Sequence, residues 1–275
     1  MVRPLMIPST DLAAGIRHHA LRMVSAANAS HIGGVLSMAD TLAVLYSGIL
    51  KVFPDQPGHP DRDRFILSKG HCCAGVYAAL ALRGFFPLSE LDSYGMDGSR
   101  LMTHISHKVP GVEFSTGSLG HGLPFALGKA LAARRKGLPW RSFALLSDGE
   151  LDEGSNWEAI LLAPQHQLDN LVLIIDYNKI QSLGAVSEVI ELEPLRAKLE
   201  AFRWAVREVD GHNHADLHAA LSSLPFSKGQ PSCLITHTTK GKGVDYMENQ
   251  IAWHYRAPNA DLLAKALAQL EQNPS

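Results

Sequence analysis

Hydrophobic positions along the chain follow two periods, which predict strands and helices in turn. Short apolar runs lead into polar turns and then into segments where apolar positions recur every three or four residues. The predicted strands are Phe65–Ser68, Phe143–Ser147, Leu171–Ile175, Trp204–Val209 and Cys233–Thr238. The predicted helices are Leu12–Ala27, 73–83, Trp157–Leu168, 194–202, 213–223 and 259–271. This alternation indicates an α/β fold with a doubly wound, mostly parallel sheet and helices on both faces.

Local signals add detail to this pattern. Ser37 and Asp40 resemble a capping box that opens a second helix, with the loop Ser30–Gly34 before it. Pro164 predicts a kink in its helix, and the proline-rich stretch 53–63 predicts a surface loop. We find no internal repeat and no long linker, so a single domain over residues 1–275 is the simplest organisation.

Composition narrows the class of protein. The 275 residues are 46% hydrophobic and carry a formal net charge of −2, which suits a globular core and gives no basic face for nucleic acid or anionic lipid. The N-terminus does not resemble a signal peptide, and we expect no stretch of the roughly 18 apolar residues that a membrane span needs. The three cysteines match neither a disulfide framework nor a metal-binding spacing, so we expect a soluble cytoplasmic chain.

Polar turns follow three of the predicted strands, at Ser68–His71, Ser147–Glu150 and 176–179. The carboxyl ends of parallel strands meet at one edge of a sheet, where ligands bind. If the strands before Asp148 and Asn178 are neighbours, a carboxylate and an amide oxygen lie side by side, as Mg²⁺ prefers. For either residue alone, a helix-capping or ordinary turn role is the simpler interpretation.

An ordered series of motifs is more specific than any of these turns alone. Ser147–Gly154, followed by Asp176–Gln181, resembles the thiamine diphosphate signature of the transketolase family, in which G-D-G and a downstream Asn hold the metal. The similarity covers nearly the whole chain and includes S-H-I-G-G at 30–34, S-K-G-H at 68–71, P-G-V-E at 110–113, S-T-G-S-L-G at 115–120, V-D-G-H at 209–212, T-K-G-K-G at 239–243 and W-H at 253–254.

The resemblance implies two cofactors, thiamine diphosphate and Mg²⁺, and a set of binding residues. Asp148, Asn178 and the backbone carbonyl of Ile180 would hold the metal. The residues implied to contact the organic cofactor are His71, Gly117, Ser118, Leu119, Gly120, Gly149, Glu150, Glu153, Asn178 and His254. The glycine-rich segment 117–120 opens an apolar helix, whose amides can receive anionic oxygens, although the same glycines also suit a plain tight turn.

The resemblance also implies catalytic roles for His31, His71, His104 and His254, in stabilising sugar oxygens and moving protons. Taken singly, most of the 14 histidines would be surface or structural residues. The sequence departs from the family pattern near these positions. Ser147 replaces a usual glycine, His121 a usual glutamine and Tyr255 a usual glycine, and the last two changes bear on the choice of substrate.

Transketolases carry a pyrimidine-binding domain and a C-terminal domain beyond the region matched here, and neither is detectable in this sequence. The resemblance therefore implies the N-terminal subunit of a split transketolase, working with a C-terminal subunit in an α2β2 assembly. It would transfer a two-carbon ketol unit from a ketose or its phosphate to an aldose or its phosphate. Two alternatives remain open, namely the α subunit of a 2-oxoacid dehydrogenase and a non-catalytic regulatory subunit.

Overall fold

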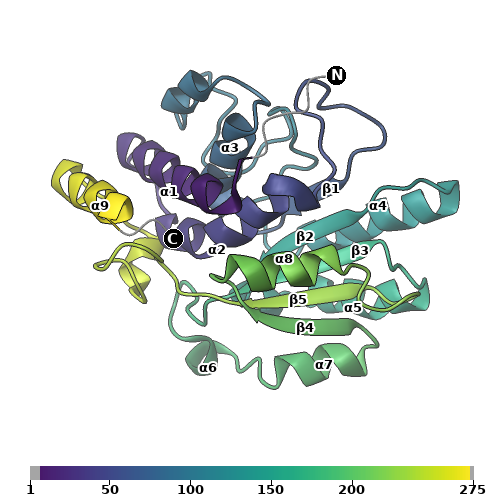
Figure 1. Cartoon of the computed structure of the whole chain (residues 1–275). Helices are drawn as coiled ribbons and strands as arrows, with labels where there is room; N and C mark the ends of the chain where they lie inside the picture. Colours follow the sequence, from purple (N-terminus) through teal and green to yellow (C-terminus); the bar gives the residue numbers. More distant parts are fainter. Residues whose placement is uncertain (1–6, 273–275) are drawn as a thin grey trace.

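Five parallel strands form the centre of the fold, and helices cover both faces of the sheet (Figure 1). The computed structural model describes residues 7–272. The strands are β1 (Arg64–Leu67), β2 (Ser142–Ser147), β3 (Leu171–Tyr177), β4 (Ala205–Asp210) and β5 (Ser232–His237), in the spatial order β1-β2-β3-β5-β4. The fold class and all five strands predicted from the sequence are confirmed, with boundaries shifted by one or two residues.

The helices divide into two layers. Their bounds are α1 (Ser9–Ala26), α2 (Ile32–Val44), α3 (Cys73–Leu82), α4 (Gly122–Lys136), α5 (Gly154–Gln165), α6 (Val186–Val189), α7 (Leu195–Ala201), α8 (His214–Ser222) and α9 (Ala260–Gln272). Side chains of α1, α2, α3 and α8 join the core on one face of the sheet, and those of α4, α5 and α7 join the core on the other face. The short helix α6 has no counterpart among the predicted elements.

Strand side chains alternate between these two cores. Phe143 and Leu145 of β2 face the α1–α2–α3 layer, whereas Ala144 and Leu146 face the α4–α5 layer. Every residue of β3 is buried, because this strand lies in the middle of the sheet with helices on both sides. Such continuous apolar strands are typical of parallel sheets, and they hold the polar turns at the sheet edge in fixed positions.

The predicted start of the second helix is wrong. Helix α2 begins at Ile32, after His31 in a left-handed conformation with φ of 75°, so Ser37 and Asp40 lie inside the helix and form no capping box. Both side chains are buried and bind distant groups: Ser37 donates to Asp176, and Asp40 accepts from Arg17. Pro164 lies inside α5, in its last turn and one residue before the helix ends, and a kink at this residue stays a prediction.

One expectation about membranes also needs correction. Within residues 7–272, the helical stretch Ile32–Ile49 is long and apolar enough to cross a membrane by length and composition. However, 78% of this stretch is buried inside the fold, where α2 packs against α1, α3 and α8. A core helix of a globular protein has the same composition, because it too is surrounded by apolar side chains.

Candidate active site

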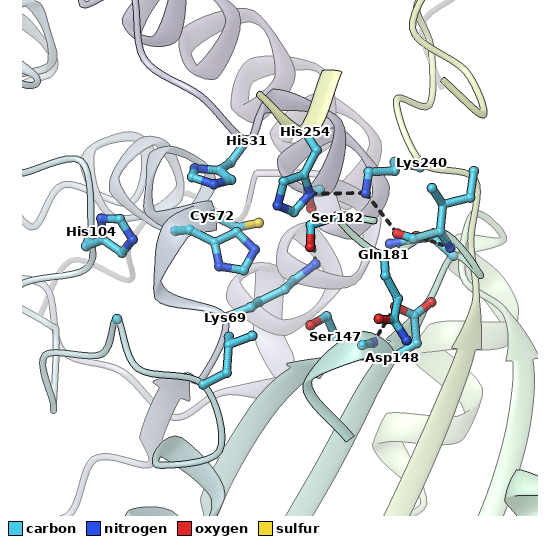
Figure 2. A pocket seen from close by; sticks show the side chains of 17 residues that line it. His31, Lys69, Cys72, His104, Ser147, Asp148, Gln181, Ser182, Lys240 and His254 are labelled. Atoms are coloured by element: carbon cyan, nitrogen blue, oxygen red, sulfur yellow. Dashed lines mark hydrogen bonds between the residues drawn. The ribbon is translucent and has the colours of Figure 1, made fainter. Parts of the chain in front are cut away.

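A cavity of about 270 Å³ opens at the carboxyl ends of the strands. Its walls come from the turns after β1, β2 and β3, the start of α2, and the segments around residues 104, 117, 240 and 254 (Figure 2). All three polar turns that the sequence placed at one edge contribute to this cavity. The topology explains the convergence, because β1, β2 and β3 are consecutive neighbours in the sheet.

Asp148 and Asn178 lie at adjacent strand ends, as the magnesium hypothesis requires. Ser147, which ends β2, pairs in register with Asp176 of β3. Asp148 Oδ1 accepts a hydrogen bond of 2.7 Å from the N–H of Gly149, and Oδ2 accepts one of 2.6 Å from the N–H of Lys179. Asn178 Oδ1 accepts a hydrogen bond of 3.1 Å from the N–H of Ile180. These bonds hold both oxygen-bearing side chains at the cavity wall.

The electrostatics of Asp148 suit a cation. Burial, together with the nearby Asp176 carboxylate, raises the pKa of Asp148 to about 6. A divalent cation would offset this cost, and the carboxylate keeps free lone pairs for it beyond its two backbone hydrogen bonds. Among the described residues, no group of three or more His, Cys, Asp and Glu side chains forms a metal cluster. The donors present are hard oxygens, which fit Mg²⁺ completed by phosphate oxygens and water.

A buried ion pair between Lys69 and Asp176 orients the side chain of Asn178. Lys69 Nζ donates to Asp176 Oδ2 at 2.5 Å, and both side chains are fully enclosed. Burial alone would lower the pKa of Lys69, but the Asp176 carboxylate outweighs it and raises that pKa. Asn178 Nδ2 donates to the same oxygen of Asp176 at 3.2 Å. Because the amide nitrogen is bound there, the amide oxygen of Asn178 points to the other side, toward the cavity. The sequence patterns placed Lys69 and Asp176 in turns at this edge but gave neither residue a role in the site.

The glycine-rich segment meets the cavity at Gly117 and Leu119. Gly120 has φ of 83°, and a Cβ there would come within 2.5 Å of Ser155 Oγ, so only glycine fits without strain. The N–H of Gly120 donates to Glu150 Oε1 at 2.9 Å, which leaves this amide occupied by the protein itself.

Four residues assigned to the cofactor lie outside the cavity lining, namely Ser118, Gly120, Glu150 and Glu153. Glu150 is fully buried behind the wall, where its carboxylate accepts from Ser68 Oγ at 2.5 Å. Ser68 Oγ in turn accepts from the N–H of Gly122 at 3.1 Å. In this chain Glu150 therefore holds the glycine-rich segment in place. Glu153 is exposed and stands just before α5.

Four histidines predicted from separate motifs come together at the cavity (Figure 2). The ring centroids of His31 and His71 are 4.7 Å apart, those of His31 and His254 are 4.9 Å apart, and those of His31 and His104 are 6.1 Å apart. Burial, followed by the influence of neighbouring His and Lys side chains, lowers the pKa of His31 to about 4 and that of His254 to about 3. The pKa of His71 also falls well below its ordinary value, chiefly through burial.

These shifts decide what the imidazoles can do at neutral pH. His31, His71 and His254 are neutral there, so each ring has one N–H donor and one acceptor nitrogen. A neutral imidazole can donate to a developing alkoxide or relay a proton without adding positive charge to the cavity.

The cavity also contains residues that sequence reasoning missed. Lys240 Nζ donates to the carbonyl of Ile180 at 2.8 Å and lies 3.2 Å from His254 Nδ1. Gln181 packs over Gly149 and donates to Asp152 at 3.0 Å, and Ser182 lines the wall beside it. The T-K-G-K-G and S-K-G-H motifs already contained the two lysines. The turn that contains Lys69 was predicted to lie at the same edge as Asp148, but nothing in the sequence indicated that Lys240 shares this cavity.

The departures from the family pattern differ in their placement. Ser147 lines the cavity next to Asp148. Tyr255 is 58% exposed, and its ring centroid lies 4.9 Å from that of His254, at the solvent side of the histidine cluster. His121 is exposed, with Nδ1 3.0 Å from the carbonyl of Leu119. Both larger side chains therefore stand outside the cavity lining, next to residues that belong to it.

Comparison with known proteins adds independent findings. The family described as "Transketolase, thiamine diphosphate binding domain" matches residues 9–275. A protein of Phocaeicola vulgatus, named as one subunit of an apulose-4-phosphate transketolase, is 41% identical over 256 residues, which cover 93% of this chain and 91% of that protein. 6-deoxy-6-sulfo-D-fructose transketolase subunit SqwG of Clostridium sp. is 40% identical over 258 residues, which cover 94% of each chain.

Solved structures agree with these relatives. Transketolase from Leishmania mexicana superimposes with a TM-score of 0.91 at 31% identity, over 98% of this chain and 42% of that one. Transketolase from Campylobacter jejuni superimposes with a TM-score of 0.91 at 32% identity, over 97% of this chain and 43% of that one. The chain thus matches the subunit-sized relatives over nearly their whole length, and less than half of these longer chains.

Proposed function

Because this chain belongs to the family of transketolase thiamine diphosphate binding domains, we propose that it is the N-terminal subunit of a two-component transketolase. The observation that carries the proposal is a single cavity that joins the Asp148–Asn178 edge to a cluster of four histidines. The first part suits a metal-bound diphosphate, and the second suits proton transfer to and from a sugar. This is the enzyme class expected from the sequence motifs.

Residues at the sheet edge would hold the cofactor's charged end. Asp148, Asn178 and the carbonyl of Ile180 would bind Mg²⁺, and the backbone at Gly117, together with Lys240, would face the diphosphate. The orientation of Asp148 by two backbone N–H groups supports this assignment, as does the raised pKa that a cation would relieve. Thiamine diphosphate itself supplies the carbon nucleophile that breaks a carbon–carbon bond beside a carbonyl group.

The histidine cluster would bind the sugar substrate and transfer its protons. His31, His71 and His104 would donate to sugar oxygens, and His254 would bridge this cluster to Lys240, from which its Nδ1 is 3.2 Å away. Together the rings would bind the hydroxyl groups of a ketose, orient the bond to be broken and move protons at those oxygens. The reaction would pass a two-carbon ketol unit from a ketose or its phosphate to an aldose or its phosphate.

A partner polypeptide would complete the enzyme. Two relatives of matching length are named as subunits, and the longer transketolases extend well beyond the matched region. We place the pyrimidine-binding domain on a separate C-terminal subunit, in a cytoplasmic α2β2 assembly that involves neither membrane nor nucleic acid. The two relatives are named for different sugars, so the sugar of this enzyme must be found by screening.

Native mass spectrometry of the tagged chain, purified from its own cells with Mg²⁺ and thiamine diphosphate, tests the proposal. We expect a complex with a second subunit that also retains the mass of the cofactor. A chain that never takes up cofactor, under conditions in which a known two-subunit enzyme does, would instead favour a non-catalytic subunit. Oxidative decarboxylation of a 2-oxoacid by the purified complex would favour the 2-oxoacid dehydrogenase class.

A further inference from the structure

A second buried polar network lies behind the cavity, centred on Asp40 of α2. This carboxylate is fully enclosed and accepts two hydrogen bonds from Arg17 of α1, at 2.8 and 2.6 Å. It also contacts His212 Nδ1 at 2.7 Å and His214 Nε2 at 3.1 Å. Burial by itself would raise the pKa of Asp40, but the hydrogen bonds from both histidines and Arg17 outweigh it and hold that pKa far below its usual range.

The hydrogen bonds of His212 define its tautomer. Its Nε2 lies 2.8 Å from the backbone nitrogen of Thr239, and that nitrogen can only donate. His212 Nε2 must therefore be the unprotonated acceptor, and Nδ1 must carry the hydrogen that points to Asp40. The ring thus forms a rigid link between a carboxylate in α2 and the backbone after β5.

That backbone leads directly into the cavity. Lys240 follows Thr239, and its ammonium group donates to the carbonyl of Ile180 and lies within hydrogen-bond distance of His254 Nδ1 (Figure 2). Neighbouring residues are fixed by other bonds: Thr238 Oγ1 donates to Asp176 at 2.5 Å, and the N–H of Gly241 donates to the carbonyl of Gly33 at 2.9 Å. His212 accepts the N–H of the peptide between Thr238 and Thr239, two residues along the chain from Lys240, and the carbonyl of Thr239 accepts from the N–H of Lys242 at 3.2 Å. The bond from His212 ties this stretch back to Asp40.

We propose that His212 is a positioning residue, which with Asp40 holds the Thr239 peptide so that Lys240 reaches Ile180 and His254 in the cavity. The proposal rests on the proposed function for the identity of the bound group, a metal diphosphate. His212 itself is outside the cavity lining and would act only through Lys240. Loss of its acceptor nitrogen would leave a partly buried N–H without its protein acceptor and free this peptide to shift.

His214 offers a matched control within the same network. Its side chain is as exposed as that of His212, 14% in each case, and it contacts the same Asp40 carboxylate. Its other nitrogen, Nδ1, is bonded to Ser9 Oγ at 2.8 Å, so this ring links Asp40 to α1 instead of to the backbone after β5. A general loss of the Asp40 network would therefore appear in variants of both histidines, and a specific effect on Lys240 only in variants of His212.

The test uses three variants of the chain, purified with its partner subunit. His212→Asn keeps a donor for Asp40 but removes the acceptor for Thr239, whereas the longer side chain in His212→Gln can restore that acceptor. His214→Asn is the control. The measurements are the hydrogen exchange rate of the Thr239 amide, the Kd for thiamine diphosphate with Mg²⁺, and the urea midpoint of unfolding.

We expect His212→Asn to speed exchange at Thr239 and to raise the Kd about tenfold, the effect of removing one hydrogen bond from a partly buried donor. We expect His212→Gln to recover most of the affinity, and His214→Asn to lower the urea midpoint without changing the Kd. Equal effects of the two Asn variants on the Kd, or an unchanged exchange rate in His212→Asn, would overturn the inference. If His212→Asn does not fold, a His212→Gln variant with normal Thr239 exchange but weakened cofactor binding would also overturn it.

The outcome separates this inference from the proposed function. A wild-type complex that binds no thiamine diphosphate contradicts the proposed function. In that case the hydrogen exchange of Thr239 in the two Asn variants still decides whether His212 holds this peptide.

Discussion

The carboxylate of Asp148 accepts a hydrogen bond of 2.6 Å from the backbone N–H of Lys179, which ties the turn after β2 to the turn after β3. The two residues are 31 positions apart in sequence, yet this bond sets one oxygen of Asp148 against the backbone of the residue that follows Asn178. The carboxylate is thereby oriented by the protein before any cation arrives. Little conformational freedom remains to be lost when a metal binds.

Asp148→Ala should abolish Mg²⁺-dependent binding of thiamine diphosphate, because it removes the only charged metal ligand that we assign. We expect the Kd, followed by fluorescence titration with excess Mg²⁺, to rise by about 100-fold or more, roughly 3 kcal/mol. Asp97→Ala changes the net charge equally at an exposed position and serves as the control. Unchanged affinity in Asp148→Ala would refute the metal assignment.

Single replacements of His31, His71 and His104 by alanine should lower the turnover of the complex. A positioned acid or base contributes about 100-fold to 10,000-fold, so we expect kcat to fall by at least about 100-fold for the ring that moves the proton. His218→Ala, at an exposed position of α8, should leave kcat unchanged. Full turnover in all three cavity variants would remove the proposed role of the cluster.

Acid should destabilise the chain through its neutral histidines. Unfolded histidines take up protons near pH 6.5, whereas burial keeps His31 neutral down to a pKa of about 4 and His254 down to about 3. The unfolded chain therefore binds more protons between these values, so the stability is full above pH 6.5 and falls as the pH drops toward 4.

Urea midpoints of the unliganded chain at pH 7, 6 and 5 check this prediction. His31→Asn removes one of these groups, so its midpoint should fall less steeply with acid than that of the wild type. A parallel pH dependence in the two proteins would mean that His31 becomes protonated at its ordinary pKa in the fold.

The Asp40 carboxylate should be a major determinant of stability. Asp40→Ala breaks the buried ion pair with Arg17, and removing one member of a buried pair costs about 3–5 kcal/mol. Arg196→Ala breaks the exposed pairs with Glu200 and Glu208 and should have at most a small effect. Equilibrium urea unfolding compares the two variants, and equal midpoints would mean that the buried pair contributes no more than the exposed ones.

Particular residues show how much of the fold and of the site could be predicted from the sequence. The five apolar runs predicted the strands, and parallel strands place the turns after them at one edge, so Asp148 and Asn178 could be assigned to one site from their positions. The histidines were placed by family motifs, and the structure brings their rings together. The prediction of a helix start at Ser37 and Asp40 was wrong, because their spacing fits a capping box and their true partners, Asp176 and Arg17, are distant in sequence.

The amino-acid sequence by itself determined the elements, the edge that carries the site and the family, because periodicity and motifs are local properties of the chain. Only the tertiary structure decided which polar groups share a contact. It placed β5 between β3 and β4, which brings Lys240 to Ile180, and it turned Glu150 toward Gly120, away from the cavity. Hydrogen bonds and ion pairs act across space over a few ångströms, and no pattern along the chain records those distances.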